Sequence, residues 1–327
     1  MFESDQLSPI ITIGESMGVI WSPEHDTQQS ASIDTRGWLS FSGAESNFAI
    51  ALARQNMPAI WLSAVSNDPF GDRIIRKMRE AGVDVTQALI CENTRTPILL
   101  KSLQNQHPPK PFYQPESTAF SLHPQYIKDT LKDLPATLLY LTSSLLHISP
   151  LWRNTAIEIW KSSALRSVPV WFELNHLTPL HSQEPASSLL KFLTSSFQYF
   201  HTLFCSWSDA QEFTQLPDPQ AVLHSWLHSK NFSPPQQVIL KFPEGAILST
   251  PTQSWTAGKI NIETTSAAPS PAKSAAFNAA FLQSLLLQKS PLDCLEAALH
   301  AQSLTDPNLG DWEGIPTLEP PQKTASF

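Results

Sequence analysis

The chain has 327 residues, 41% of them hydrophobic, which is enough for one large α/β domain or two smaller ones with a sizeable core. Its formal net charge is −8 and its pI is about 5.7, and no basic run is present that could follow a phosphate backbone. These values argue against nucleic acid and against an anionic membrane surface as partners.

The N-terminal residues and the cysteines favour a cytoplasmic protein with reduced thiols. The stretch "MFESDQLSPIITIGES" lacks the basic and long apolar regions of a signal peptide, and no apolar run approaches the roughly 20 residues that span a bilayer. Cys91, Cys205 and Cys294 lie far apart and form no CxxC or Cys/His metal spacing. We therefore expect a cytoplasmic chain without a metal site.

The first part of the chain predicts alternating strands and helices. The stretch "PIITIGES" predicts a buried strand that ends at Gly14, "SGAESNFAIALARQNM" a helix, "AIWLSAVSND" a strand and "FGDRIIRKMREAGVDV" an amphipathic helix. Two polar segments, about 17–41 and 95–120, predict short exposed strands outside the main sheet. We expect these segments to form a small β lid inserted in the domain.

The rest of the chain continues the alternation. Strands are predicted in "LLYLTSSLLHIS", "VPVWFELN", "YFHTLFCS" and "QVILKF", helices near 152–166, 185–197 and 208–228, and a short strand pair near 246–263. This order favours an α/β fold in a single domain over 1–327, with a mostly parallel sheet and helices on both faces. No GxxxxGK[ST] or GxGxxG pattern occurs, so P-loop and Rossmann interpretations have no support.

The stretch "SPAKSAAFNAAFLQSLL" predicts a helix from Ala275 with an unusual turn before it. Phe277, Phe281 and Leu285 recur at helical spacing. A helix that opens toward an enzyme pocket commonly begins with glycines, because bare backbone N–H groups there hold an anion. Here the turn Pro271–Ala275 contains neither a glycine nor a carboxylate.

Several stretches occur in a fixed order over nearly the whole chain: "ITIGESMG", "SGAESNFAIALAR" with "WLSAVSNDPFGDRIIRKMREAGVDV", "SAAFNAAFLQSLL" and "GDWEGIPT". With them the chain resembles the ribokinase/PfkB sugar kinases, most closely the 2-keto-3-deoxygluconate kinase branch. The resemblance implies a ribokinase-like fold, ATP and Mg as cofactors, and a homodimer formed through the lid.

The resemblance also implies a sugar pocket. Asn amides and carboxylates suit sugar hydroxyls, because each hydroxyl is both donor and acceptor. The alternative is that Gly43 and Asn47 only cap a helix. The implied substrate-binding positions are Gly14, Glu15, Gly43, Ala44, Asn47, Gln114, Glu173, Asn175 and His176.

The catalytic signature of the family is altered in this chain. Aligned on Phe277, the segment that carries Gly-Ala-Gly-Asp in the family reads "PSPAKSAAF". Ala275 occupies the position of the catalytic Asp, and the anion hole falls on Ala272, Lys273 and Ser274. Neither alanine nor serine takes a proton from a sugar hydroxyl near pH 7. Loss of a base costs about 10²–10⁴ in rate, and damage to an anion hole about 10²–10³.

The matches on the cofactor side are weak. Ser206 and Asp209 align with a pair that helps to organise magnesium in the family, and Lys241 and Gly245 remain from a nucleotide-side "KLGxxG". Gln114 stands where an arginine is expected, and it cannot replace the bidentate fork of arginine. These changes argue against the use of ATP and Mg by this chain.

Two residues leave alternatives open. Lys273 forms a standing anion site for a carboxylate or phosphate ligand, or it is a solvated lysine. His176 is a repurposed acid–base group, or it is a surface or hydrogen-bonded histidine.

Three functions are therefore compatible with the sequence. The first is a sugar-kinase homologue that has lost phosphoryl transfer and acts by binding a ligand or partner. The second is an enzyme of another class that uses the old sugar pocket on a sugar-acid-like substrate, with Glu15, Glu173 and His176 as its titratable groups. The third is an active 2-keto-3-deoxygluconate-type kinase with a displaced base.

Overall fold

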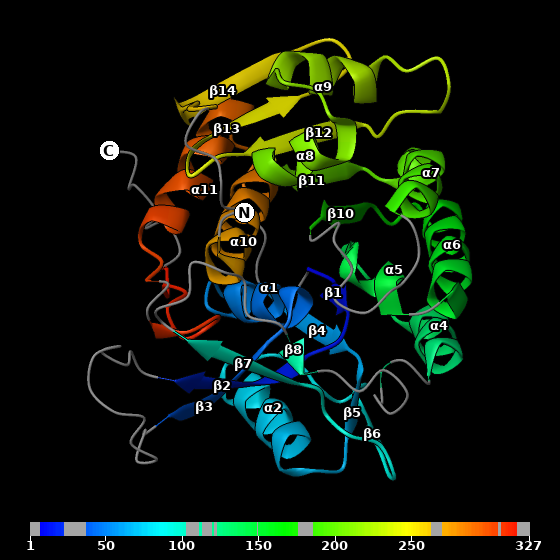
Figure 1. Ribbon diagram of the computed structural model, residues 1–327, viewed down its shortest axis with the longest axis vertical. Helices are drawn as coiled ribbons and strands as arrows, with labels where there is room; N and C mark the ends of the chain where they lie inside the picture. Colours follow the sequence, from blue (N-terminus) through cyan, green and yellow to red (C-terminus); the bar gives the residue numbers. More distant parts are fainter. Residues whose placement is uncertain are drawn as a thin grey trace, which may run out of the picture.

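The computed structural model describes residues 7–22, 37–102, 111–112, 120, 123–148, 150–175, 186–262, 270–306 and 309–318. Its centre is an eight-stranded sheet (Figure 1). In spatial order the strands are β14 (Ser254–Lys259), β13 (Glu244–Ser249), β12 (Gln237–Lys241), β11 (Thr202–Ser206), β10 (Val170–Leu174), β9 (Leu138–Thr142), β1 (Ile10–Ile13) and β4 (Ala59–Leu62). Strands β4 to β12 in this order pair in parallel, and β13 and β14 add antiparallel at one edge. The predicted mostly parallel sheet is confirmed.

Helices cover both faces of this sheet. On one face lie α1 (Ala44–Ala53), α2 (Pro69–Glu80), α10 (Pro271–Leu286) and α11 (Pro291–Ser303). On the other lie α4 (Pro124–Asp133), α5 (Ser144–Ile148), α6 (Pro150–Leu165), α7 (Ala186–Ser196), the 3₁₀ turn η2 (Phe197–Tyr199), α8 (Trp207–Thr214) and α9 (Pro219–Leu227). None of the helices in the described part of the chain combines the length and apolar character that crossing a bilayer requires.

The period of two along each strand decides which face a side chain joins. In β9, Leu138 and Tyr140 pack with α1 and α10, whereas Leu139 and Leu141 pack with the helices of the opposite face. The same alternation in β10 directs Trp171 toward α10. Polar residues at matching positions near the carboxyl ends of these strands therefore meet on the α1/α10 face.

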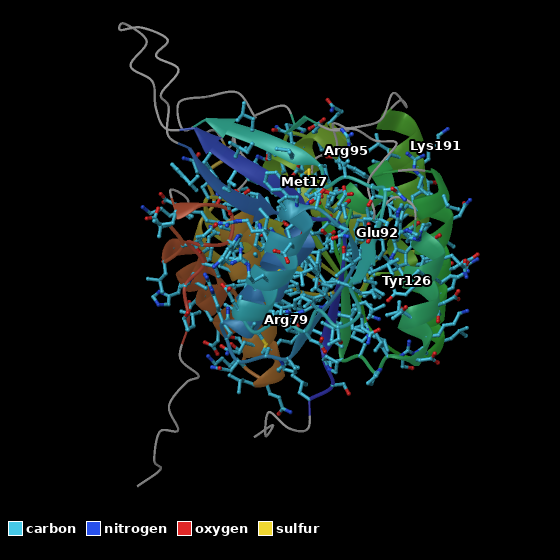
Figure 2. All side chains as sticks on the ribbon, turned by 90° about the horizontal axis from the view of Figure 1, so that it is seen from below. Met17, Arg79, Glu92, Arg95, Tyr126 and Lys191 are labelled. Carbon is cyan, nitrogen blue, oxygen red and sulfur yellow. The ribbon has the colours of Figure 1, made fainter. Side chains whose placement is uncertain are left out.

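A second, four-stranded sheet combines the two segments predicted as exposed strands. Its order is β3 (Trp38–Ser42), β2 (Met17–Ser22), β7 (Ile98–Ser102) and β8 (Pro111–Phe112). Strands β5 (Ala64–Ser66) and β6 (Leu89–Cys91) form a separate pair. Figure 2 shows the four-stranded sheet beside α2, where Arg79 is labelled, with Met17 on β2. The division into one domain with an inserted lid stays a prediction.

Three predicted elements are divided in the structure. The helix expected near 208–228 is wrong as a single element, because α8 ends at Thr214, its C-cap Gln215 has a left-handed φ of 58°, and α9 begins at Pro219 after its N-cap Asp218. The strand expected in "AIWLSAVSND" is divided into β4 and β5, because the two halves pair in different sheets.

The strand expected in "LLYLTSSLLHIS" is wrong in its second half. Strand β9 ends at Thr142, whose hydroxyl accepts a hydrogen bond from the Ser144 N–H at 3.3 Å, and α5 follows from Ser144 to Ile148.

Candidate functional site

A buried ion pair lies at the carboxyl ends of two strands of the main sheet. Glu173 on β10 and Lys241 on β12 point to the α1/α10 face, and Nζ of Lys241 lies 2.6 Å from Oε1 of Glu173. The two side chains are only 8% and 1% exposed. The ammonium also lies over the rings of Phe204 and Phe277, at 5.6 and 5.9 Å from their centroids.

The carboxylate of Glu173 is saturated with donors. Ser274 Oγ donates to Oε1 at 2.5 Å and Asn278 Nδ2 to Oε2 at 2.8 Å, and the hydroxyl of Tyr140 also donates to Oε2. Burial alone raises the pKa of Glu173, but the Lys241 ammonium and these hydrogen bonds outweigh it and hold the pKa below its ordinary value. Glu173 is therefore a stable anion and a poor proton acceptor. We call Tyr140, Glu173, Lys241, Ser274 and Asn278 the Glu173 network.

The start of α10 differs from the predicted turn before Ala275. The helix begins at Pro271, because Ser270 caps it and proline at the first position is preorganised for helical φ. The N–H of Lys273 donates to Ser270 Oγ at 3.3 Å, and the N–H of Ser274 donates to the Ser270 carbonyl at 3.0 Å. The segment predicted as a loop is thus the first turn of the helix.

This first turn does not fit a transferring phosphoryl group. Pro271 has no N–H to offer, and the N–H groups of Lys273 and Ser274 already have partners. Ala272 and Ala275 are buried, at 0% and 3% exposure, and belong to the apolar core. The base position therefore holds a packed methyl group, and the hydroxyl of Ser274 is bound to Glu173.

The start of α1 holds a second buried polar group. Glu45, which the sequence interpretation missed, is 2% exposed, and the Thr142 N–H donates to its Oε1 at 3.1 Å. Gly14 permits this position, because a Cβ there would lie 2.3 Å from Oε2. Burial raises the pKa of Glu45 to about 7, opposed by hydrogen bonds from Thr142 and assisted by the charge of Glu173.

Asn47 lies two residues further along α1. It is fully buried, and neither the nitrogen nor the oxygen of its side-chain amide has a hydrogen-bond partner among the described residues. Its backbone N–H donates to the Gly43 carbonyl at 2.9 Å, so Gly43 is the N-cap of the helix. A Cβ at Gly43 would lie 2.4 Å from the Glu15 carbonyl, which brings the end of β1 against the start of α1. Ala44 is the first residue of the helix.

Asn175 follows the last residue of β10 and makes several hydrogen bonds to the end of β9. Ser143 Oγ donates to the Asn175 carbonyl at 2.5 Å and accepts from the Asn175 N–H at 2.9 Å. The side-chain oxygen of Asn175 also accepts a bond from Ser144 at 3.0 Å. Asn175 thereby fixes the ends of β9 and β10 relative to each other. Gln114 and His176, the remaining implied substrate positions, lie outside the described residues.

The implied cofactor positions have local partners. Ser206 caps α8, accepting from the Asp209 N–H at 3.0 Å and donating to Asp209 Oδ2 at 2.5 Å. Gly245 pairs with Gly258 in the β13–β14 hairpin. Within the described ranges, no group of three or more His, Cys, Asp or Glu side chains is placed to hold a metal ion. The cofactor assignments stay predictions.

Lys273 lines a pocket of about 340 Å³ beside α10 and α11. Its other lining residues are Pro243, Glu244, Gly258, Leu299, His300, Gln302 and Ser303. The side-chain oxygen of Gln302 is buried there without a hydrogen-bond partner in the described part of the chain. The pocket lies on the nucleotide side implied by the resemblance.

The structure brings together residues for which different roles were expected. Glu173 was expected to bind substrate, Lys241 to bind cofactor and Ser274 to replace an anion hole, yet all three contact one another. Tyr140 and Asn278 complete the network and were missed. A polar Asn278 within the apolar run "AAFNAAF" was the available signal.

Comparison with known proteins agrees with the fold and the motifs. The model of the family described as pfkB family carbohydrate kinase matches residues 8–310. The 2-dehydro-3-deoxygluconokinase of Bacillus subtilis (strain 168) is 33% identical over 112 residues, which are 34% of this chain and 34% of that protein. The alignment thus spans about a third of the length of this curated relative.

Solved structures resemble the chain over almost its full length. The 2-dehydro-3-deoxygluconokinase of Thermotoga maritima has a TM-score of 0.76 at 17% identity, and the alignment covers 96% of each chain. A fructokinase from Vibrio cholerae O395, solved with fructose, ADP and a calcium ion, has a TM-score of 0.73 at 17% identity, covering 96% of this chain and 97% of that one. With the match of the family model to most of its length, this chain belongs to the pfkB family of carbohydrate kinases.

Proposed function

We propose that this pfkB-family chain has lost ATP-dependent phosphoryl transfer and acts by binding a sugar-acid-like ligand or a partner. The observation that carries the proposal is the first turn of α10. Its base position is a buried methyl group, and two of its amides have partners within the helix. Phosphoryl transfer depends on positioning and on fixed donors for the developing charge, and this turn has no base at the catalytic position, while the N–H groups of Lys273 and Ser274 are already hydrogen-bonded to Ser270.

The Glu173 network makes a displaced base difficult to accommodate. Glu173 is the carboxylate that reaches the start of α10, through its bond to Ser274. Its ion pair with Lys241 and its lowered pKa keep it deprotonated but weakly basic. An active kinase would need another base from outside this network.

The binding part of the proposal rests on the start of α1. A buried amide without partners costs stability unless a ligand or water satisfies it, and Asn47 has both its amide atoms in this condition. Glu45, with its pKa near 7, is a second buried polar group at the start of this helix, and it offers either a donor or an acceptor at neutral pH. Sugar hydroxyls can donate to or accept from each of these two groups.

The experiment combines binding with turnover. Calorimetry with 2-keto-3-deoxygluconate and related sugar acids measures binding, and a phosphorylation assay with ATP and Mg over the same compounds measures transfer. The proposal expects binding by at least one compound, weakened in Asn47→Ala, and no phosphorylated product. A phosphorylated product would establish the displaced-base kinase instead, and no binding by any sugar acid would leave a protein partner as the ligand class.

A second candidate is a non-kinase enzyme that acts on a sugar-acid-like substrate in the old pocket. The favouring observation is that two nearby carboxyl groups have pKa values shifted in opposite directions, up to about 7 for Glu45 and downward for Glu173. Such a separation is typical of acid–base pairs in enzymes. This candidate predicts consumption of a bound sugar acid without ATP, abolished in Glu45→Gln, whereas the first proposal predicts that the ligand is recovered unchanged.

We further propose a cytoplasmic homodimer that uses the four-stranded sheet. Ile20, Leu39 and Leu100 are cross-strand neighbours on β2, β3 and β7, and Leu39 and Leu100 are 48% and 56% exposed. An exposed apolar row of this kind suits an interface. Sedimentation should give twice the monomer mass, and Leu39→Lys with Leu100→Lys should give the monomer.

A further inference from the structure

Arg54, at the end of α1, is the centre of a cluster that joins three distant parts of the chain. Its Nη1 donates to the carbonyls of Trp312 at 2.9 Å and Glu313 at 3.2 Å, and also to that of Ile315. Its guanidinium lies 5.5 Å from the ring centroid of Trp312. A guanidinium that faces several backbone carbonyls holds a segment without regular secondary structure in one conformation.

The same segment also contacts the four-stranded sheet through β3. The side chain of Glu313 accepts a hydrogen bond from Ser40 Oγ. Phe41 and Trp312 stack with their ring centroids 5.2 Å apart. Ser40 and Phe41 are both buried, at 1% and 0% exposure, so these contacts are shielded from water.

A third attachment comes from the end of α11. Asp306 donates its N–H to the Gly314 carbonyl at 3.2 Å. A Cβ at Gly314 would lie 1.9 Å from the Asp306 carbonyl, so the two backbones touch. Figure 1 shows the red C-terminal segment running from α11 past α1 to the edge of the four-stranded sheet. We call residues 309–318 the C-terminal strap.

We propose that the C-terminal strap clamps the carboxyl end of β3 to α1, so that the junction between the four-stranded sheet and this helix is held in one conformation. The strap contacts β3 by a hydrogen bond and a ring stack, and contacts α1 by the Arg54 guanidinium. Separation of this end of β3 from the strap would break both of its contacts together. Because α1 also carries Glu45 and Asn47, the strap fixes the sheet relative to the polar groups at the start of that helix.

Hydrogen exchange of the full chain tests this clamp. Arg54→Lys keeps the charge, but the lysine side chain is shorter and its ammonium does not reach the position of Nη1 that faces the three carbonyls. Hydrogen bonds of a charged group stabilise the segments that they join against local opening. When they are lost, we expect backbone amides in these segments to exchange about tenfold faster or more. We expect this acceleration in both 38–42 and 309–318, with the main-sheet strands β9 to β12 exchanging as in the wild type.

Arg166→Lys is the matched control. Arg166 also donates to backbone carbonyls, those of Leu131 at 2.8 Å and of Leu134, but at the ends of α4 and α6. This variant should accelerate exchange near 131–134 and leave 38–42 unchanged. If Arg54→Lys speeds exchange in 309–318 alone, or leaves both segments unchanged, the strap does not clamp β3 and the proposal is wrong.

If Arg54→Lys does not fold, Ser40→Ala tests the contact between β3 and the C-terminal strap in its place. It removes the bond to Glu313 and the local bond of Ser40 Oγ to the Phe41 carbonyl, and we expect faster exchange in 38–42 with an unchanged main sheet. Wild-type exchange of 38–42 in this variant would overturn the clamp.

Discussion

The ion pair of Glu173 and Lys241 joins two strands that are not neighbours in the sheet. Strand β11 lies between β10 and β12, and the ammonium of Lys241 crosses above Phe204 of that strand to reach the carboxylate. Burying both charges is costly, and good geometry with further hydrogen bonds is needed to offset this cost. Ser274, Asn278 and Tyr140 supply those bonds. The start of α10 is thus joined to β10 and β12 by polar contacts in which every partner is satisfied.

Breaking this pair from one side should destabilise the protein strongly. Lys241→Met leaves a buried carboxylate without its cation, and we expect a loss of about 3–5 kcal/mol in the free energy of unfolding. The control is Lys128→Met. Nζ of Lys128 lies 2.5 Å from Oε2 of Glu158, but the Glu158 side chain is 57% exposed, so we expect a loss of only about 0–1 kcal/mol. Urea denaturation measures both. Similar losses in the two variants would contradict a structural role for the Glu173 network.

Stability should depend on pH through Glu45. Its pKa in the folded state, about 7, lies above the unfolded value of about 4.3, so the folded state binds more protons between these values. Its contribution is therefore present at low pH and is lost as pH rises from about 4.3 to 7, by about 4 kcal/mol in total.

Glu45→Gln removes that titration. The difference in unfolding free energy between wild type and variant should move in favour of the variant from pH 5 to pH 8, and then stay constant. Glu173, with its lowered pKa, contributes in the opposite sense and only at more acidic pH, because its stabilisation is lost as pH falls through its folded pKa. A pH-independent difference would show that Glu45 titrates normally.

The cap of α10 should be as important as that of α11. Ser270→Ala removes the acceptor of the Lys273 N–H and should cost about 1 kcal/mol. Ser290→Ala, which removes the acceptor of the Asp293 N–H in the other Ser-Pro helix start, should cost about the same. Thermal denaturation measures both. An unaffected Ser270→Ala variant would indicate that the helix starts only at Ala275, as predicted from the sequence.

Restoring the family's residues should not restore transfer. The triple variant Ala272→Gly, Ser274→Gly, Ala275→Asp weakens the helix by about 1 kcal/mol per glycine and adds a carboxylate at a position that is 3% exposed. It also removes the Ser274 bond to Glu173. We expect a destabilised protein without phosphorylated product, measured by denaturation and a coupled ADP assay. Kinase activity in this variant would mean that the rest of the site is intact.

The sequence predicted most of the sheet and helices because their signals are local. Alternating apolar segments and proline or serine at helix starts mark each element. The Ser270-Pro271 pair is such a signal, because serine is a common N-cap and proline a common first residue of a helix. The helix was predicted to start at Ala275 because the family has a loop at these positions, whereas α10 starts at Pro271. Pro219 behind Asp218 similarly marked the break between α8 and α9.

The contacts of the site were not local and could not be predicted in the same way. Glu173 and Lys241 stand near the ends of two predicted strands, but strand order decides whether two such ends meet. Glu45 gave no signal beyond an acidic residue in the first turn of a helix. Arg54 contacts a carbonyl 258 positions away, and "GDWEGIPT" was interpretable only as a family motif. Such pairs follow from tertiary packing, which propensity and periodicity do not encode.

The most direct measurement of the central claim is phosphoryl transfer from ATP and Mg to 2-keto-3-deoxygluconate and other sugar acids, with the Thermotoga maritima 2-dehydro-3-deoxygluconokinase as a positive control. Phosphorus NMR detects both ADP and any sugar phosphate. If this chain has lost phosphoryl transfer, the control converts its substrate while this chain yields no sugar phosphate at the same enzyme concentration. A sugar phosphate formed by this chain, and lost when Mg is chelated, would contradict this loss.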